Sequence, residues 1–487
     1  MTNLTSETFD QNARAALRDT QLRGALDNLV KTFGERRKEV IKTVDDWEAL
    51  RNRARQIKDE TLAHLDNYLE QFTGNAERAG ATIHWARDGK EVCRIVLDLI
   101  DAIDATNVVK SKSMATEEIH LNHALEAEGI NPIETDLGEW IIQLANETPS
   151  HIVVPAIHKT KGQIAALFVE KTGIEKTDDV DVLTNTARKV LRSRFAEAEV
   201  GISGVNFGVA ETGTILILEN EGNIRLTTSL PKVHIALMGI EKVIPKFADL
   251  DVFLKLLPRS GTGQRLTTYQ SLITGTKLER DDEGPDEVHI ILMDNGRSRM
   301  LAHPVTRQSL ACIRCGACLN ACPVYQQIGG HAYGAVYPGP IGAVITPQLT
   351  GLAKTKQLPY ASSLCGACRE VCPVKIDIPA LLLHLRAEIV DGEADGISAE
   401  TRVKKKFGER AAFLMYSFLW RRPKLYNFGA KLSRFFQKGV VKDGKARSGF
   451  ASLVPPLGAW TKWRDAPQVA PRTFKEIWKE DLSKRND

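Results

Sequence analysis

ACIRCGACLNACPV at residues 311–324 and LCGACREVCPV at residues 364–374 together hold seven of the eight cysteines in this chain of 487 residues. The cysteines of the first stretch follow the pattern C-x2-C-x2-C-x3-C, and a proline comes directly after the last one. This is the spacing of bacterial two-cluster ferredoxins, whose thiolates bind iron-sulfur clusters. The second stretch repeats the end of the pattern, C-x2-C-x3-C followed by proline. The sequence therefore predicts a helical domain with two [4Fe-4S] clusters.

In proteins with this spacing, the cysteine before the proline binds the cluster of the other stretch. This exchange assigns four cysteines to one cluster and three to the second. The predicted ligands are Cys312, Cys315, Cys318 and Cys372 for cluster 1, and Cys322, Cys365 and Cys368 for cluster 2.

Cluster 2 lacks one cysteine. Ser362 stands three residues before Cys365, where a fourth cysteine of the second stretch would fall. A serine oxygen is a harder ligand than a thiolate, and soft ligands suit iron-sulfur clusters. We therefore expect either a cubane with a non-cysteine fourth ligand or a [3Fe-4S] cluster, and we favour the cubane.

Zinc and disulfides are the ordinary alternatives for a cysteine-rich chain. Structural zinc takes four ligands per site, and seven cysteines divide poorly into such sets. Disulfides belong to secreted chains, whereas the N-terminus has no basic and then apolar signal segment. The remaining cysteine, Cys93, lies on the apolar side of a predicted helix and is expected to be a core residue.

The composition is that of an ordinary soluble protein, with 43% hydrophobic and 26% charged residues. No apolar run approaches the roughly 20 residues that cross a bilayer, and the longest, at 411–420, is about half that length. We therefore expect a cytoplasmic protein in which the thiols stay reduced.

The charge is unevenly distributed. From residue 401 to the end there are 21 Lys and Arg against 7 Asp and Glu, and this segment also holds 14 of the 31 aromatic residues. Basic residues among aromatics suit docking to a protein partner or to the same chain, contact with an anionic membrane surface, or nucleic acid. We favour docking, keep the membrane surface as the alternative, and expect no nucleic acid.

The pattern along the chain predicts four regions. They are a helical N-terminal arm at 1–70, an α/β domain at 71–300, the two-cluster ferredoxin domain at 301–395 and a basic, aromatic-rich C-terminal domain at 396–487. The charged residues of the arm are expected to form its solvated face.

The second region alternates between strand-like and helix-like segments, which is typical of an open α/β sheet with helical crossovers. Several of the later strands are expected to be antiparallel. The predicted strands are 81–86, 107–112, 130–136, 151–157, 213–219, 223–229, 232–239 and 287–294, and the predicted helices are 89–103, 116–129, 137–145 and 180–200.

Polar residues in this region suggest ligand sites. Lys110 and Lys112, with Ser111 and Ser113, end a strand at the edge where open α/β sheets bind ligands. The glycine-bearing stretches 204–215 and 259–268 could hold an anion through backbone amides, but neither matches a P-loop or a dinucleotide fingerprint, so tight turns are expected.

Histidines are also present near these segments. His151 and His158 flank a predicted strand and are expected to be structural. His331, in the linker between the cysteine stretches, is not expected to be a cluster ligand. The linker itself, HAYGAVYPGPIGAVITP at 331–347, is expected to wrap the clusters and exclude water.

Taken together, VVKSKSMATEEIHLNHALE, TDLGEWIIQLA, HIVVPAIHK and GVNFGVAETGTI, with the two cysteine stretches, resemble the lactate utilization protein B family over nearly the whole chain. The resemblance implies an α/β domain of the sugar-phosphate isomerase and CoA-transferase type, a two-cluster ferredoxin domain and a basic C-terminal domain. It also implies that the chain passes electrons, with two companion lactate-utilization proteins, during oxidation of L-lactate to pyruvate. The resemblance includes the seven-cysteine arrangement, in which the second stretch has only three cysteines. A non-cysteine residue at position 362 is therefore what the resemblance implies.

Two other functions remain open from the sequence. In one, the α/β domain is an enzyme acting on a carboxylate or acyl-CoA, with Glu211 as nucleophile or base and the clusters as a redox regulator. In the other, the clusters form a sensor and the basic tail binds polynucleotide. Electron transfer is the leading hypothesis, and no catalytic residue is assigned.

Overall fold

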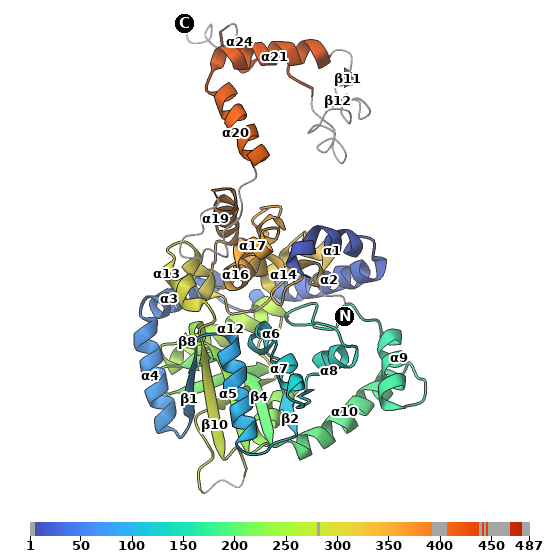
Figure 1. Ribbon diagram of the computed structural model, residues 1–487, viewed down its shortest axis with the longest axis vertical. Helices are drawn as coiled ribbons and strands as arrows, with labels where there is room; N and C mark the ends of the chain where they lie inside the picture. Colours follow the sequence, from blue (N-terminus) through green and yellow to red (C-terminus); the bar gives the residue numbers. More distant parts are fainter. Residues whose placement is uncertain are drawn as a thin grey trace. The chain divides into compact units, whose positions relative to one another are not determined.

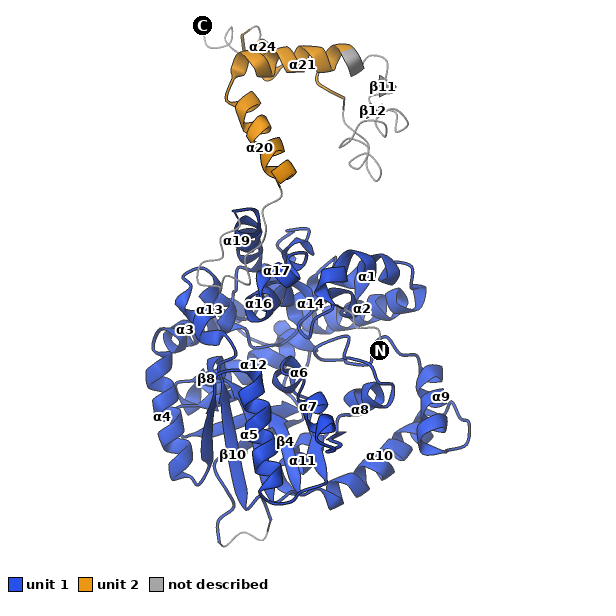
Figure 2. Cartoon of the chain, in the orientation of Figure 1, with its two compact units in different colours: residues 1–404 blue, residues 405–487 orange. Residues whose placement is uncertain are grey.

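The computed structural model describes residues 5–279, 283–391, 407–437, 441–442, 445–446 and 468–479. The chain divides into two compact units, residues 1–404 and 405–487 (Figure 2). The first unit holds the predicted arm, α/β region and cysteine region. The boundaries between those three regions stay predictions.

A six-stranded sheet, parallel throughout, forms the centre of the first unit (Figure 1). Its strand order is β1-β10-β7-β4-β2-β3. The strands are β1 (Thr82–Ala86), β2 (Val108–Lys110), β3 (Ile133–Glu134), β4 (Val200–Gly204), β7 (Val233–Gly239) and β10 (Glu287–Met293).

Both faces of this sheet are covered, as expected for parallel strands. In β10, Ile290 and Leu292 pack with α4 (Leu65–Arg78), whereas Ile291 and Met293 pack in the cluster that contains α5 (Gly89–Asp101) and α7 (Leu121–Ala127). Successive side chains of a strand point to opposite faces, which is why β7, VHIALMG, is buried along its whole length.

A second sheet has four strands in the order β8-β5-β6-β9. The pairs β5–β6 and β6–β9 are antiparallel, and β5–β8 is parallel. The strands are β5 (Phe207–Val209), β6 (Thr214–Glu219), β8 (Val243–Ile244) and β9 (Tyr269–Ile273). Phe207 and Leu216 join the core that contains the cysteine region, so the α/β region and the cysteine region share one hydrophobic core.

The remaining helices of the first unit precede, connect or follow these strands. They are α1 (Phe9–Ala16), α2 (Thr20–Ile41), α3 (Trp47–Ala63), α6 (Met114–Glu118), α8 (Leu137–Leu144), α9 (Lys161–Thr172), α10 (Val180–Glu197), α11 (Asn223–Ser229), α12 (Leu250–Gly261), α13 (Arg297–Ala302), α14 (Ala317–Ala321), α15 (Tyr325–Ile328), α16 (Gly339–Thr350), α17 (Leu352–Thr355), α18 (Ala367–Val371) and α19 (Ile378–Asp391). The 3-10 helices are η1 (Ser6–Thr8), η2 (Ile240–Lys242), η3 (Phe247–Asp249), η4 (Thr306–Ala311), η5 (His331–Tyr333) and η6 (Leu358–Tyr360).

Two predicted strands are not strands. Residues 151–157 form turns, because the His151 ring accepts hydrogen bonds from the backbone N–H groups of Val153 and Val154. In the same segment Pro155 has no N–H to give to a ladder. Residues 223–229 form helix α11, whose first turn is capped by the carboxylate of Glu219.

Two further expectations for the α/β region are corrected. The strands at 232–239 and 287–294 lie parallel to each other, and antiparallel pairing among the described residues is confined to the second sheet and to the short β11–β12 pair of the second unit. The helix predicted at 116–129 is two helices, α6 and α7, separated by His120 in the left-handed conformation (φ 54°).

The second unit contains α20 (Phe407–Trp420), α21 (Pro423–Gln437), the two-residue strands β11 (Val441–Lys442) and β12 (Lys445–Ala446), and α24 (Phe474–Ile477). Large apolar side chains of α20 are exposed, among them Phe413, Met415 and Phe418. Across the described parts of both units, no helix is long and apolar enough to cross a membrane.

Candidate iron-sulfur site

The two cysteine stretches fold into the same backbone shape. Arg314 and Leu364, each directly before a cysteine, both have a left-handed backbone, with φ of 60° and 55°. Gly316 and Gly366, each directly after that cysteine, have φ of 79° and 88° and cap the short helices α14 and α18. A left-handed residue is strained unless it is glycine, so the two turns are held in place by their surroundings. Helices α14 and α18 pack against each other.

The seven sulfur atoms fall into two electrostatically interacting sets. Besides burial, the charges of Cys312 and Cys372 raise the pKa of the Cys315 and Cys318 thiols. The second set contains the other three cysteines. Here too, besides burial, the charge of Cys365 raises the pKa of Cys322, and the charges of Cys322 and Cys365 raise the pKa of Cys368. The last cysteine of each stretch therefore interacts with thiols of the other stretch, and the assignment of ligands to two clusters stays a prediction.

Burial makes these thiols poor anions on their own. It raises the pKa of both Cys315 and Cys368 to about 12. Cys365 is the exception, because it is exposed and the backbone N–H of Ala367 lowers its pKa. Metal ligation requires thiolates. The buried thiols therefore need a bound cation that lowers their pKa, and the iron of a cluster would do this.

The sulfur spacing suits a guest larger than one metal ion. Four thiolates around zinc at about 2.3 Å form a tetrahedron with edges of about 3.8 Å. Across the described residues, which include all seven cysteines, no three cysteine sulfurs lie within 4.8 Å of one another. The arrangement is therefore too open for a zinc tetrahedron, and it fits the soft thiolate donors of an iron-sulfur cluster.

Ser362 occupies the position in the second stretch that Cys312 has in the first. The backbone N–H of Arg314 donates to the sulfur of Cys312 at 3.4 Å, and the N–H of Leu364 donates to the Ser362 hydroxyl at 3.1 Å. Both side chains thus curl back on their own turn in the same way.

The linker between the two stretches is buried around the cysteines. In α16, residues 339–348 are all buried, and the backbone N–H of Ile341 hydrogen-bonds the Cys318 sulfur. Tyr325 and Tyr333 are fully buried close to Cys318, and the Tyr325 hydroxyl donates to the carbonyl of Ser150.

The N-terminal arm holds the second stretch with buried cations, which corrects the expectation that its charged residues are all solvated. The guanidinium of Arg51 donates to the carbonyl of Cys372 through Nε at 3.0 Å and Nη2 at 2.7 Å. Lys58 is fully buried and donates to the carbonyl of Glu241. Arg51, Ala54 and Lys58 repeat at helical spacing on the buried side of α3, so their place on the apolar stripe was a signal available in the sequence.

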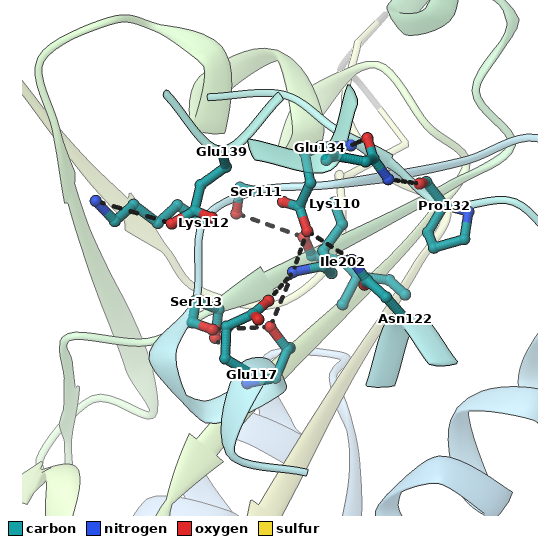
Figure 3. A network of polar contacts seen from close by, with 12 residues as sticks. Lys110, Ser111, Lys112, Ser113, Glu117, Asn122, Pro132, Glu134, Glu139 and Ile202 are labelled. Carbon is teal, nitrogen blue, oxygen red and sulfur yellow. Dashed lines mark hydrogen bonds and ion pairs between the residues drawn. The ribbon is translucent and has the colours of Figure 1, made fainter. Parts of the chain in front are cut away.

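The lysines proposed as an anion site are already paired. Figure 3 shows the ammonium of buried Lys110 between Glu134 at 2.7 Å and Glu117 at 3.2 Å. Burial alone would lower the pKa of Lys110, but the two carboxylates raise it above its usual value. Lys112 donates to the carbonyl of Val153, and burial raises the pKa of its neighbour Glu139 to about 8. Lys110 is therefore a structural cation.

The glycine stretches contain turns next to regular elements, because 204–215 includes strand β5 and 259–268 begins with the end of α12. Gly213 (φ 69°) packs so closely on the backbone of Ala76 that a Cβ would lie 2.2 Å from its nitrogen. Glu211, the candidate nucleophile or base, is exposed and accepts a hydrogen bond from the backbone N–H of Phe247 at the start of η3. It caps that turn.

The other candidates have structural partners as well. His151 is buried, its Nε2 lies 3.1 Å from the amide oxygen of Asn320 in α14, and burial lowers its pKa to about 4. His158 lies 2.7 Å from a carboxylate oxygen of Glu147, and His331 lies 2.7 Å from the carbonyl of Thr148. Cys93 is half-buried beside the core of α5 and α7.

A group of potential metal ligands lies apart from the cysteine sets. His303, His384 and Glu388 place their donor atoms within 4.8 Å of one another. The Nε2 atom of His384 is 3.0 Å from the Glu388 carboxylate one helical turn later in α19, so a contact within the helix accounts for two of these three residues.

Comparison with known proteins covers nearly the whole chain. It is 41% identical to Lactate utilization protein B of Bacillus licheniformis over 480 residues, 98% of each chain. It is 42% identical to Lactate utilization protein B of Macrococcus caseolyticus over 482 residues, 99% of this chain and 98% of that protein. The chain belongs to the lactate utilization protein B family.

Three family patterns match successive parts of the chain. The LUD domain matches residues 69–293, the 4Fe-4S dicluster domain 308–376 and the C-terminal domain of lactate utilisation protein B 384–482. The second match contains all seven cysteines of the two sets, so this part of the chain is a [4Fe-4S]-binding domain, and the first covers the parallel sheet.

Two further proteins are similar to this lactate utilization protein B family member. The uncharacterized electron transport protein YkgF of Escherichia coli (strain K12) is 41% identical over 471 residues, 97% of this chain and 96% of that protein. A crystal structure of a DUF162 family protein from Deinococcus radiodurans matches 47% of this chain and 98% of its own, with a TM-score of 0.28 and 11% identity.

Proposed function

We propose that this chain is the electron-transfer subunit of a complex that oxidises L-lactate to pyruvate, working in the reducing cytoplasm with two companion lactate-utilization proteins. The observation that supports the proposal is that the last cysteine of each stretch interacts electrostatically with thiols of the other stretch, as two clusters with exchanged ligands would require. The relatives named for lactate utilization supply the substrate.

The residues of the chain fit two [4Fe-4S] clusters. Cys312, Cys315, Cys318 and Cys372 would hold cluster 1, and Cys322, Cys365, Cys368 and the Ser362 hydroxyl would hold cluster 2. Lactate oxidation releases two electrons, and two bound clusters, each carrying one electron, would supply the matching capacity.

The surrounding residues keep water from cluster 1 and leave cluster 2 closer to the surface. Cys315, Cys318 and Cys372 are buried, whereas Cys365 is exposed. Arg51 fixes the backbone at Cys372, and burial and hydrogen bonding of this kind are among the factors that set cluster potentials. The exposed side at Cys365 is suited to exchange of electrons with a partner protein.

Reconstitution tests the proposal directly. The full chain, purified without air and mixed with its two companions, should show reduction of its iron-sulfur chromophore when L-lactate is added and no reduction in buffer alone. Cys315→Ser should lose this response. If the wild-type clusters stay oxidised with all three proteins and L-lactate present, the proposal fails.

A further inference from the structure

The sheet and the cysteine region enclose a cavity of about 610 Å³. The chain leaves β2 for β3 on one side, and leaves β4 for β7 and β10 on the other. The direction of connection therefore reverses between β2 and β4, and open parallel sheets bind ligands beyond the carboxyl ends of the strands at this point. The cavity lies there, with Ser113 after β2, Asn206 after β4 and Lys242 after β7 in its lining.

One end of the cavity is formed by charged residues beside the first cysteine set. Glu241, Lys242, Arg314 and Cys315 all line it. Arg314 lies against the ring of Tyr337 at 4.5 Å, and its Nη2 atom is 3.7 Å from Oε1 of Glu241. These side chains therefore lie together, directly next to the proposed ligands of cluster 1.

The polar atoms at this end are incompletely paired. Nη1 of Arg314 and Oε1 of Glu241 are buried without a hydrogen-bond partner, and the Glu241 side chain is only 2% exposed. Lys242 has no hydrogen bond or ion pair from any other residue that the structure describes. Unpaired buried polar groups are costly. These two buried atoms, with the half-buried ammonium of Lys242 beside them, indicate a bound group with complementary atoms.

Charge balance with the cysteine sulfurs explains only part of this arrangement. Lys242 and Arg314 both interact electrostatically with Cys312 and would offset negative charge on a bound cluster. The carboxylate of Glu241 is negatively charged and would not offset the charge of a cluster. An occupant that offers both an anionic group and a donor satisfies all three residues.

We propose that this end of the cavity binds a small 2-hydroxycarboxylate, with its carboxylate against Lys242 and Arg314 and its hydroxyl donating to Glu241. This inference rests on the proposed function and places the lactate-binding site on this chain, next to cluster 1. The remaining walls are largely apolar, with Ile141, Ile152 and Leu257 among them, and they leave room for side chains longer than the methyl group of lactate.

Binding to the full chain tests the site without turnover. In calorimetry on anaerobically purified holoprotein, L-lactate should bind at one site per chain. Propanoate, which lacks the hydroxyl, should bind at least about tenfold more weakly, and L-2-hydroxybutanoate should bind about fourfold more tightly for its added methylene. Equal affinity for propanoate and L-lactate would overturn the role of Glu241.

A matched pair of variants tests the cationic side. Lys242→Met should weaken L-lactate binding at least about tenfold. Lys246→Met, at an exposed lysine outside the cavity lining, should not change it. An unchanged affinity in Lys242→Met, or no L-lactate binding by the wild-type chain, overturns the inference.

The two proposals fail separately. If L-lactate reduces the clusters only through the companions and the isolated chain does not bind it, electron transfer stands and this site is wrong. If the chain binds L-lactate as described but the reconstituted complex shows no reduction, the electron-transfer proposal is wrong and the site stands.

Discussion

Ser362 is the residue on which the nature of the second cluster depends. Its hydroxyl makes the same local contact in the second stretch that the Cys312 sulfur makes in the first. The spacing predicted where the missing ligand would fall. The side-chain direction required the structure, because it follows from the left-handed turn at Leu364, a conformation for which a leucine gives no sequence signal.

Ser362→Ala should leave cluster 2 with three protein ligands and convert it largely to a [3Fe-4S] form. Ser362→Cys should retain four irons and lose iron more slowly in air, because a thiolate is the softer ligand. Iron counting and electron paramagnetic resonance on protein prepared without air measure both. An unchanged iron count and spectrum in Ser362→Ala would exclude the serine as ligand.

Arg51→Met should destabilise the first cysteine set. The buried carbonyl of Cys372 loses its charged donor in this variant. The N–H of Lys375 still donates to this carbonyl at 3.2 Å, so the cost is that of the lost charged hydrogen bonds, about 2 kcal/mol. Denaturant unfolding and the rate of iron loss to a chelator report the effect.

Arg53→Met is the control for Arg51→Met. It removes an arginine whose side chain is 56% exposed. Loss of an ion pair at such a position should cost less than about 1 kcal/mol. Equal effects of the two variants would contradict the role given to Arg51.

His234 should make the folded chain sensitive to mild acid. Its ring is fully buried on β7, and burial lowers its pKa to about 4. The Nε2 atom is 2.8 Å from the Ser203 hydroxyl, and Nδ1 has no hydrogen-bond partner. The titratable neighbour of His234 is His289. Because the folded pKa lies below the ordinary value of about 6.5, the unfolded chain gains a proton first as the pH falls. Stability is therefore unaffected above about pH 6.5, falls between about 6.5 and 4, and has lost about 3 kcal/mol below that window.

His234→Gln should flatten this part of the pH dependence, measured as the free energy of unfolding at several pH values across that window. His64→Gln, at an exposed histidine of the N-terminal arm, is the control. A variant slope equal to that of the wild-type chain would show that His234 is not the titrating group.

At the level of elements, the local sequence pattern predicted the wrong secondary structure where a hydrogen-bond partner from outside the segment decides it. The sequence NIRLTTS is rich in β-branched residues and favours a strand, yet it forms α11 because the carboxylate of Glu219 accepts from the first N–H groups of the helix. Segments 232–239 and 287–294, which are largely apolar, form buried strands as predicted, and 81–86 forms the edge strand β1.

Two glycine variants in helices should have opposite effects. Gly342→Ala in α16 would place a Cβ 1.8 Å from the carbonyl oxygen of Tyr337. Such an overlap with backbone should cost about 3 kcal/mol or more. Gly24→Ala in α2 meets no atom within 4 Å. It should stabilise the chain by about 0.5–1 kcal/mol.

Thermal unfolding of both glycine variants checks the comparison. A tolerated Gly342→Ala would mean that α16 can shift away from the cysteines. A destabilising Gly24→Ala would contradict the open space around that position in α2.

At the scale of the whole molecule, the fold class followed from the sequence, whereas the shared core did not. Periodicity shows that a segment has a buried side but not what covers it. The arm was predicted only as a helical element at 1–70, and the structure places its Leu22 and Leu26 in one core with the cysteine region.

Removal of residues 405–487 should separate partner docking from cluster binding. The first unit contains both cysteine sets, so the shortened chain should keep its iron content. The second unit is basic and exposes the aromatic face of α20, so the shortened chain should lose at least about tenfold in affinity for its companions, measured by pull-down or interferometry. Retained affinity for the companions together with lost binding to anionic vesicles would assign the unit to the membrane surface instead.

The exchange of terminal cysteines also constrains how the protein is made. During synthesis the first stretch leaves the ribosome without Cys372, which follows only after the whole linker and most of the second stretch. A cluster delivered to the nascent chain would find an incomplete set of cysteine ligands until the second stretch has emerged. If the ligands are exchanged as assigned, neither site is complete until the second stretch has emerged, which favours cluster insertion after translation.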